Sequence, residues 1–102
     1  MITWTEERTA GMDVWWMNVD GEPVLHLSRL DDTDSYTVYC RMDYQNFGYT
    51  SNMSKSLEDA KTEAKHWYCD LLHKRIRAHR RMIKHYKKEI KTINKRRGEI
   101  NA

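Results

Sequence analysis

The chain contains a stretch of about 40 residues, from Ser56 to Arg97, without a single proline or glycine. These two residues most often end a helix, and helices in globular proteins average only about 11 to 12 residues. The stretch begins with a helix-start pattern, because the Ser56 hydroxyl can accept a hydrogen bond from the amide of Asp59 and acidic residues occupy the first turn. The sequence therefore predicts one long helix over residues 55–97.

The apolar residues of this helix follow two different patterns. The first has a 3-4-3-4 spacing that would lie across a sheet, and it comprises Leu57, Ala60, Ala64, Trp67 and Leu71. The second is shifted by one residue and comprises Leu72, Ile76, His79, Ile83, Tyr86, Ile90 and Ile93. It keeps a seven-residue repeat for about three heptads, which is typical of a coiled coil. We expect a homodimer with a seam of Ile76, Ile83, Tyr86, Ile90 and Ile93; a break near Leu72 would instead give two helices and a compact fold.

Charge is divided very unevenly along the chain. Residues 1–54 carry three basic and nine acidic side chains, whereas residues 55–102 carry fifteen basic and six acidic ones. The total of +3 therefore hides a sheet segment at −6 and a helix segment at +9. A concentrated basic surface attracts polyanions and steers encounter with them.

The most basic part of the helix lies between Leu71 and Arg97, which contains twelve lysines and arginines and one acidic residue, Glu89. Like charges at helical neighbours repel by a few tenths of a kcal/mol per pair, so a polyanion would relieve this repulsion. We expect nucleic acid or a nucleoprotein complex as the partner, with salt-sensitive phosphate contacts from Arg77, Arg80, Arg81, Lys84, Lys87, Lys88 and Lys91. A solvated helix face and an acidic protein partner are the alternatives.

Between Asp13 and Thr50 the apolar residues alternate, as β-strands require. The alternating sets are Trp15, Met17 and Val19, then Leu25 and Leu27, then Tyr36, Val38, Cys40 and Met42. Asp20-Gly21 predicts a tight hairpin turn, and the Asp31–Asp34 segment predicts a second turn. Phe47–Thr50 could add a fourth strand, and Ile2–Thr5 could pair at an edge.

We therefore predict an α+β fold, a three- to four-stranded antiparallel β-meander followed by one long basic helix. The length of 102 residues fits a single domain, with an acidic sheet over 1–54 and the helix over 55–97. The distal part of the helix would form the dimer.

Alternation also predicts a sheet face that the helix does not cover. If Trp15, Met17, Leu25, Leu27 and Val38 face the helix, Trp16, His26 and Tyr39 lie on the opposite face, beside Arg41 and Asp43. An exposed aromatic patch can anchor a protein, and the negative charge nearby favours protein over bases. The alternative is that Ile2 and Trp4 fold over this face, or that the strand register differs.

Metal and catalytic motifs are weak. The spacing His66-x-x-Cys69-x-x-x-His73 could place three ligands on one helix face, with Cys40 as a fourth, but neither CxxC nor HExxH is present. Asp32 and Asp34 lack the glycine and glutamate of a calcium loop. No nucleophile beside a base and no phosphate-binding loop is visible, so we expect a non-catalytic protein without metal or cofactor.

Three sequence features bear on the cellular compartment of the protein. Its first residues show no signal-peptide pattern, no run approaches the roughly 20 apolar residues of a membrane span, and Cys40 and Cys69 fall in separate segments. We expect a cytoplasmic protein that does not enter a membrane.

One resemblance bears on function. A short tryptophan-rich meander, then Gly48-Tyr49-Thr50, then Ser56–Lys61 opening a helix resembles small accessory proteins encoded by bacteriophages, over residues 14–65. Such proteins bind and inhibit host machinery, including defence complexes that handle nucleic acid. The resemblance implies an inhibitor acting by protein contact, through the aromatic sheet or the basic helix, as the alternative to direct nucleic-acid binding.

Overall fold

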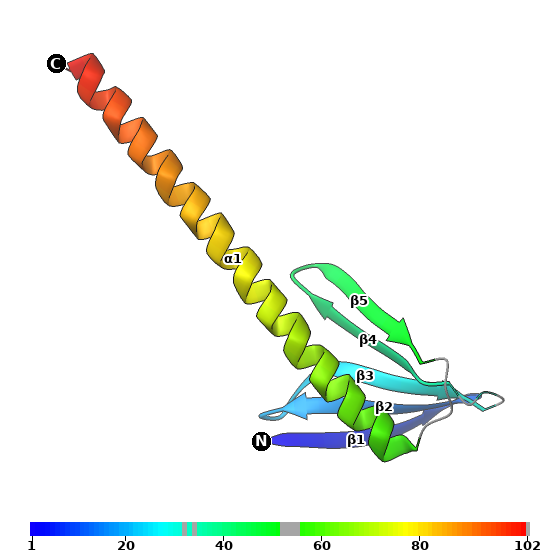
Figure 1. The fold of residues 1–102 in the computed structure, drawn as a ribbon. Helices are drawn as coiled ribbons and strands as arrows, with labels where there is room; N and C mark the ends of the chain where they lie inside the picture. The colour runs from blue at the N-terminus through cyan, green and yellow to red at the C-terminus, as the bar shows by residue number, and fades with distance from the viewer. Residues whose placement is uncertain (32, 34, 52–55, 102) are drawn as a thin grey trace. The chain divides into compact units, whose positions relative to one another are not determined.

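The computed structural model describes residues 1–31, 33, 35–51 and 56–101. Five strands precede one helix in the chain (Figure 1): β1 (Ile2–Thr9), β2 (Met12–Val19), β3 (Glu22–Leu30), β4 (Thr37–Met42), β5 (Gln45–Thr50) and α1 (Leu57–Asn101). Backbone contacts divide the residues into two compact units, Met1–Lys65 and His66–Ala102, and α1 contributes to both. The single domain expected from chain length stays a prediction.

The sheet is an antiparallel meander in which the strands lie in chain order, β1-β2-β3-β4-β5 (Figure 1). The predicted α+β class is confirmed, but the strand count is five rather than three or four. The two segments that the sequence suggested as additional strands are both strands. β5 includes Phe47–Thr50, and β1 pairs with β2 along its whole length, from Ile2 opposite Val19 to Thr9 opposite Met12.

Two of the turns use backbone conformations that few residues accept. At the β2–β3 turn, Asp20 and Gly21 have φ values of 51° and 85°, as a tight primed turn requires, so the predicted hairpin is confirmed. At the β4–β5 turn, Asp43 and Tyr44 have φ values of 52° and 63°. Asp43 therefore lies in a turn and not beside Arg41 on the strand face, because the left-handed backbone ends the alternation there.

The turn predicted over Asp31–Asp34 follows β3. Asp31 lies directly after the end of β3 and is exposed, and its amide donates to the Gly11 carbonyl at 3.1 Å. Asp32 and Asp34 lie outside the described residues.

The core of the first unit lies between one sheet face and the first turns of α1. The five residues predicted on that face, Trp15, Met17, Leu25, Leu27 and Val38, are all buried. Ala60 and Ala64 of α1 are 4% and 0% exposed, and their small side chains let the helix backbone approach the sheet closely. Tyr36 and Cys40 complete this layer.

The helix begins as its sequence predicts. The amide of Asp59 donates to Ser56 Oγ at 3.1 Å, and Glu58 and Asp59 lie in the first turn. The structure assigns one helix across Leu71 and Leu72, where the apolar pattern shifts, so the alternative with a break at Leu72 is wrong. None of the helical segments in the described part of the chain combines the length and hydropathy that a membrane crossing requires.

Candidate functional site

The predicted dimer seam is an exposed apolar stripe on the second unit. Ile76, Ile83, Tyr86, Ile90 and Ile93 are between 46% and 56% exposed. Burying apolar side chains stabilises a protein or a complex by about 25 cal/mol for each Å² of apolar surface removed from water. A periodic row of them along one helix is typical of a surface that packs against another helix.

A heptad frame places the charged residues relative to this seam. With Ile76, Ile83 and Ile90 at position a, the d positions are Leu72, His79, Tyr86 and Ile93. Since each residue turns the helix by about 100°, the positions follow one another around the axis in the order a, e, b, f, c, g, d. Positions e, b and f are therefore adjacent columns on one side of the seam.

The seven predicted phosphate-binding residues all fall in these three adjacent columns. Position e holds Arg80 and Lys87, position b holds Arg77, Lys84 and Lys91, and position f holds Arg81 and Lys88. We call this set the basic face. From Arg77 to Lys91 it extends about 21 Å along the helix, which matches about six base pairs of a duplex with a 3.4 Å rise.

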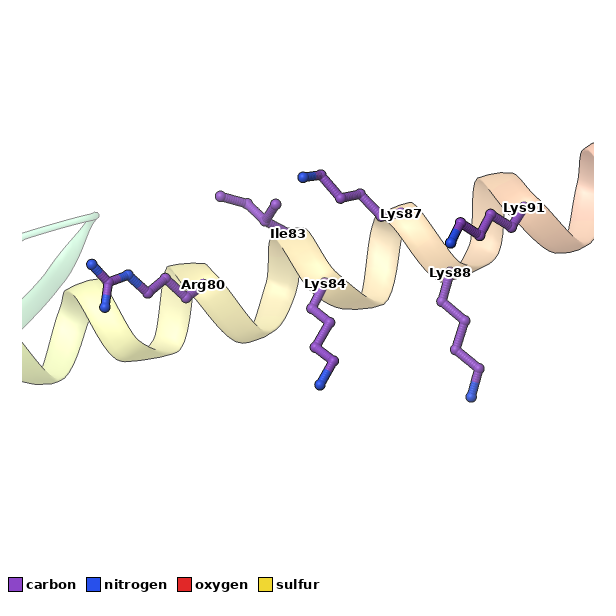
Figure 2. Close-up of a pocket in the computed structure, with 6 residues that line it drawn as sticks. All are labelled: Arg80, Ile83, Lys84, Lys87, Lys88 and Lys91. Atoms are coloured by element: carbon purple, nitrogen blue, oxygen red, sulfur yellow. The ribbon is translucent and has the colours of Figure 1, made fainter.

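The side chains follow this arrangement. Figure 2 shows Lys84 and Lys88 extending together on one side of α1, while Ile83 and Lys87 point to the other side. The space lined by Ile83 and the surrounding cations, about 510 Å³, lies along a solvent-exposed helix surface. These residues therefore line an open surface rather than an enclosed cavity.

The basic face carries uncompensated charge. All seven of its residues are exposed, and within the described residues none of them forms an ion pair. Glu89, the acidic residue between Leu71 and Arg97, lies outside the basic face, and its Oε2 atom is 3.8 Å from Nε2 of His85. A surface with this density of free cations is suited to a polyanion.

The arginines of the sheet behave differently. Arg8 donates to Asp13 at 2.7 Å and to Asp31 at 2.8 Å, and Arg29 lies 3.9 Å from Asp13. The Arg8 guanidinium also holds the pKa of Asp31 below its ordinary value. Two of the three basic residues in the strands are thus engaged by carboxylates, unlike the seven residues of the basic face.

The three residues of the second predicted surface are neighbours across adjacent strands. Trp16 pairs with His26 across β2 and β3, and His26 pairs with Tyr39 across β3 and β4. Their ring centroids lie 4.9 Å and 5.1 Å apart at tilts of 51° and 43°, which is a favourable range for aromatic contacts. We call these three residues the aromatic row.

Polar contacts fix both ends of the aromatic row. Trp16 Nε1 donates to Glu7 at 3.0 Å, and the Tyr39 hydroxyl donates to Asn46 at 2.6 Å. In the centre, His26 Nδ1 is buried and has no hydrogen-bond partner among the described residues, and burial lowers the pKa of this imidazole. The row is therefore held by hydrogen bonds at both ends, and the surroundings of its centre favour the neutral imidazole.

A shallow hollow of about 230 Å³ adjoins the row, and it is lined by the three row residues together with Pro23, Val24, Leu25, Cys40 and Arg41. This volume is below the roughly 300 to 1,000 Å³ of ordinary small-molecule sites. The hollow fits one side chain of a partner better than a substrate.

The alternative in which Ile2 and Trp4 cover the aromatic row is wrong. Trp4 pairs with Met17 and so lies on the buried face, where Lys61 Nζ is 5.4 Å from the centre of its ring. Ile2 is opposite Val19 on the same face. Because strand residues alternate, neither side chain reaches the row.

The possible metal ligands differ in burial and in the element that carries them. Cys40 is buried in the sheet, where burial raises the pKa of its thiol, whereas Cys69 is exposed on α1. His66 and His73 are also exposed on α1. Across residues 1–31, 33, 35–51 and 56–96, no group of three histidine, cysteine or acidic side chains is arranged to hold a metal ion.

Two features were not predicted from the sequence. The ion-pair network of Arg8, Asp13, Arg29 and Asp31 depends on the pairing of β1 with β2, which polar edge residues conceal. Val14 is buried on the face of the aromatic row, although its alternation with Trp16 could have revealed it. Comparisons of the chain with protein-family models, with curated proteins and with solved structures found no match.

Proposed function

We propose that this chain is a non-catalytic, cytoplasmic binding protein whose basic face contacts the phosphates of nucleic acid, free or within a nucleoprotein complex. One observation carries the proposal: seven exposed cations occupy three adjacent columns of α1, and none of them forms an ion pair within the described residues. A helix face of this kind has a strong preference for a polyanion.

Electrostatics within α1 favours the same partner. Arg77/Arg81, Arg80/Lys84, Lys84/Lys88 and Lys87/Lys91 are all four residues apart, and each such pair costs a few tenths of a kcal/mol. Phosphates between these side chains would replace repulsion by attraction and release counterions into solution. Contacts made to the backbone alone would depend little on base sequence.

We further propose that a second copy of the chain covers the dimer seam. The a and d side chains are about half exposed, and pairing two copies would remove them from water without covering positions b and f. Polar replacement of Ile83 and Ile90 should then produce monomers by light scattering. A wild-type monomer at tens of micromolar would contradict the pairing.

Charge reversal tests the basic face directly. The variant Arg80→Glu/Arg81→Glu/Lys84→Glu/Lys88→Glu should lose at least about 100-fold in affinity for duplex DNA or RNA, because four phosphate contacts become repulsive. The matched control Arg80→Lys/Arg81→Lys/Lys84→Arg/Lys88→Arg keeps every charge and should bind within a few-fold of wild type. Unchanged binding by the reversed variant, with helix content verified by circular dichroism, would exclude the basic face.

A second candidate function is inhibition of a host protein, such as a defence complex, through the aromatic row. The observation that favours it is the continuous arrangement of Trp16, His26 and Tyr39, with a hollow of side-chain size beside them. Aromatic anchors of this kind dominate the energetics of protein interfaces. Trp16→Ala/Tyr39→Ala should abolish capture of such a partner, and unchanged capture would rule out this surface.

A further inference from the structure

We infer that two copies of α1 pair antiparallel along the seam, so that their basic faces join into one surface on one side of the pair. The inference depends on the proposed function, because it specifies how a second copy would complete the polyanion site. It follows from the charges beside the seam and from the apolar layers within it.

The charges beside the seam differ between its two flanks. Position e, on one flank, holds the cations Arg80 and Lys87, whereas position g, on the other flank, holds Arg75, Met82, Glu89 and Arg96. In a parallel pair, position e of one helix meets position g of the other. Reversing one helix brings e against e and g against g, so orientation decides which charges meet.

A parallel, in-register pair brings only like charges together. Arg75 at position g would face Arg80 of the second copy, and this contact would occur twice by symmetry. Glu89 would face an uncharged residue, Asn94, and Met82 would face Lys87. The pair would therefore have two repulsive contacts at its flanks and no attraction to offset them.

An antiparallel pair centred near Arg81 places Glu89 opposite a basic residue. In this alignment Glu89 of each copy faces Arg75 of the other, while Arg80 faces Lys87 on the opposite flank. Two attractive contacts then balance two repulsive ones. Moving the alignment by one heptad loses the attraction, because Arg75 then meets Met82 or Arg96.

The layers of the seam favour the same alignment. Ile83 would pack on His79, and Ile76 on Tyr86, so each large polar side chain meets an isoleucine. A parallel pair would instead place His79 against His79 and Tyr86 against Tyr86, in layers crowded with polar groups. Alternation of larger and smaller side chains across a seam packs better than pairing two large ones.

The antiparallel arrangement has a consequence for binding. The e and b cations of both copies, Arg77, Arg80, Lys84, Lys87 and Lys91, fall on the same side of the pair. This joint surface would extend about 30 Å along the axis, or about nine base pairs, compared with about 21 Å for one helix. Since the Arg80–Lys87 repulsion lies within this surface, a polyanion bound there would strengthen the pairing.

Disulfide trapping at two positions tests the orientation in the full-length protein. Cys69 is exposed and occupies position a of the same frame, and the antiparallel alignment places it opposite Ile93 of the second copy. The unmodified protein is mixed with the variant Cys69→Ser/Ile93→Cys under mild oxidation, with and without a 20-base-pair duplex (a length of about two helical turns). Non-reducing gels and mass spectrometry then identify the linked peptides.

The expected product is a mixed disulfide between Cys69 and the cysteine introduced at position 93. It should be at least about tenfold more abundant than either self-linked dimer, because identical positions would lie about 36 Å apart, far beyond disulfide reach. The duplex should raise its yield. The buried Cys40 serves as an internal control that should remain a thiol.

Two results would overturn the inference. Efficient Cys69–Cys69 linkage in the unmodified protein would show a parallel pair, and no linkage of any kind at tens of micromolar with the duplex present would show that the seam does not pair. Neither result removes the basic face. Duplex binding that persists in either case would leave the proposed function standing, and loss of that binding would be seen separately by fluorescence anisotropy.

Discussion

His26 is the residue whose surroundings most constrain the aromatic row. It lies between the rings of Trp16 and Tyr39, its Nδ1 atom is buried, and burial lowers the pKa of the imidazole below its ordinary value. A proton on this ring would have to be accommodated between two aromatic side chains without a carboxylate partner among the described contacts. The row is therefore most stable when His26 is neutral.

This environment predicts a pH dependence of stability with a definite sign. The unfolded chain takes up a proton at His26 near pH 6.5, but the folded chain resists it, so the free energy of unfolding falls as pH drops below about 6.5. The slope cannot exceed about 1.4 kcal/mol per pH unit, since a single proton is involved. Urea unfolding at pH 7.5 and 5.5 measures it. His26→Gln should reduce this dependence, and an identical dependence in the variant would contradict the assignment.

Gly48 is constrained by the strand beside it. It lies opposite Tyr39, and a Cβ atom at this position would lie 2.5 Å from the backbone oxygen of Val38. Gly48→Ala should therefore lower the free energy of unfolding by about 1 to 3 kcal/mol, because β4 or β5 has to shift. Gln45→Ala, an exposed change in the same strand, is the control. Equal stability of the two variants would show that the sheet accommodates the methyl group.

At the scale of elements, the contact between α1 and the sheet depends on two alanines. Ala64 is completely buried, and its neighbour Lys65 is exposed. Ala64→Leu should destabilise the protein by about 1 to 3 kcal/mol through overpacking. Lys65→Leu adds the same side chain at an exposed position and should change stability by less than about 0.5 kcal/mol. Thermal or urea unfolding of the two variants gives the comparison, and a smaller effect at Ala64 would contradict the packing.

Alternating apolar residues were sufficient to predict the three central strands and the buried face. Trp15, Met17 and Leu25 all have the burial that the pattern predicts, because each lies in a strand with one face on the core. The extent of β1 could not be predicted. It is an edge strand whose residues Glu6, Glu7 and Arg8 are all exposed, so it has no apolar alternation to detect.

The aromatic row and the basic face could be predicted from the sequence to different extents. The aromatic row follows from strand alternation together with register, and only the structure supplies the register that places Trp16, His26 and Tyr39 side by side. The basic face follows from helical periodicity alone, since an uninterrupted helix fixes which residues share a side. What covers the seam is a property of an assembly, and the sequence of one chain gives its period but not its partner.

For the whole molecule, the separation of charge into an acidic sheet segment and a basic helix segment is the property that the proposed function uses. The net charges of −6 and +9 lie on opposite sides of residue 55. Steering by the helix segment should make association with a polyanion fast at low ionic strength and slower as salt screens it. An acidic protein partner would show the same steering but no affinity for bare nucleic acid.

The central claim is that the basic face binds phosphates, and fluorescence anisotropy across a salt series measures this most directly. Labelled duplex DNA, single-stranded DNA and RNA are titrated with the full-length protein between about 50 and 200 mM salt. Seven phosphate contacts predict a slope of about −6 for log K against log salt on duplex DNA. The four-residue charge reversal should reduce the magnitude of this slope by about 3 to 4. Absence of binding to all three nucleic acids at the lowest salt would contradict the account and favour the protein-directed function.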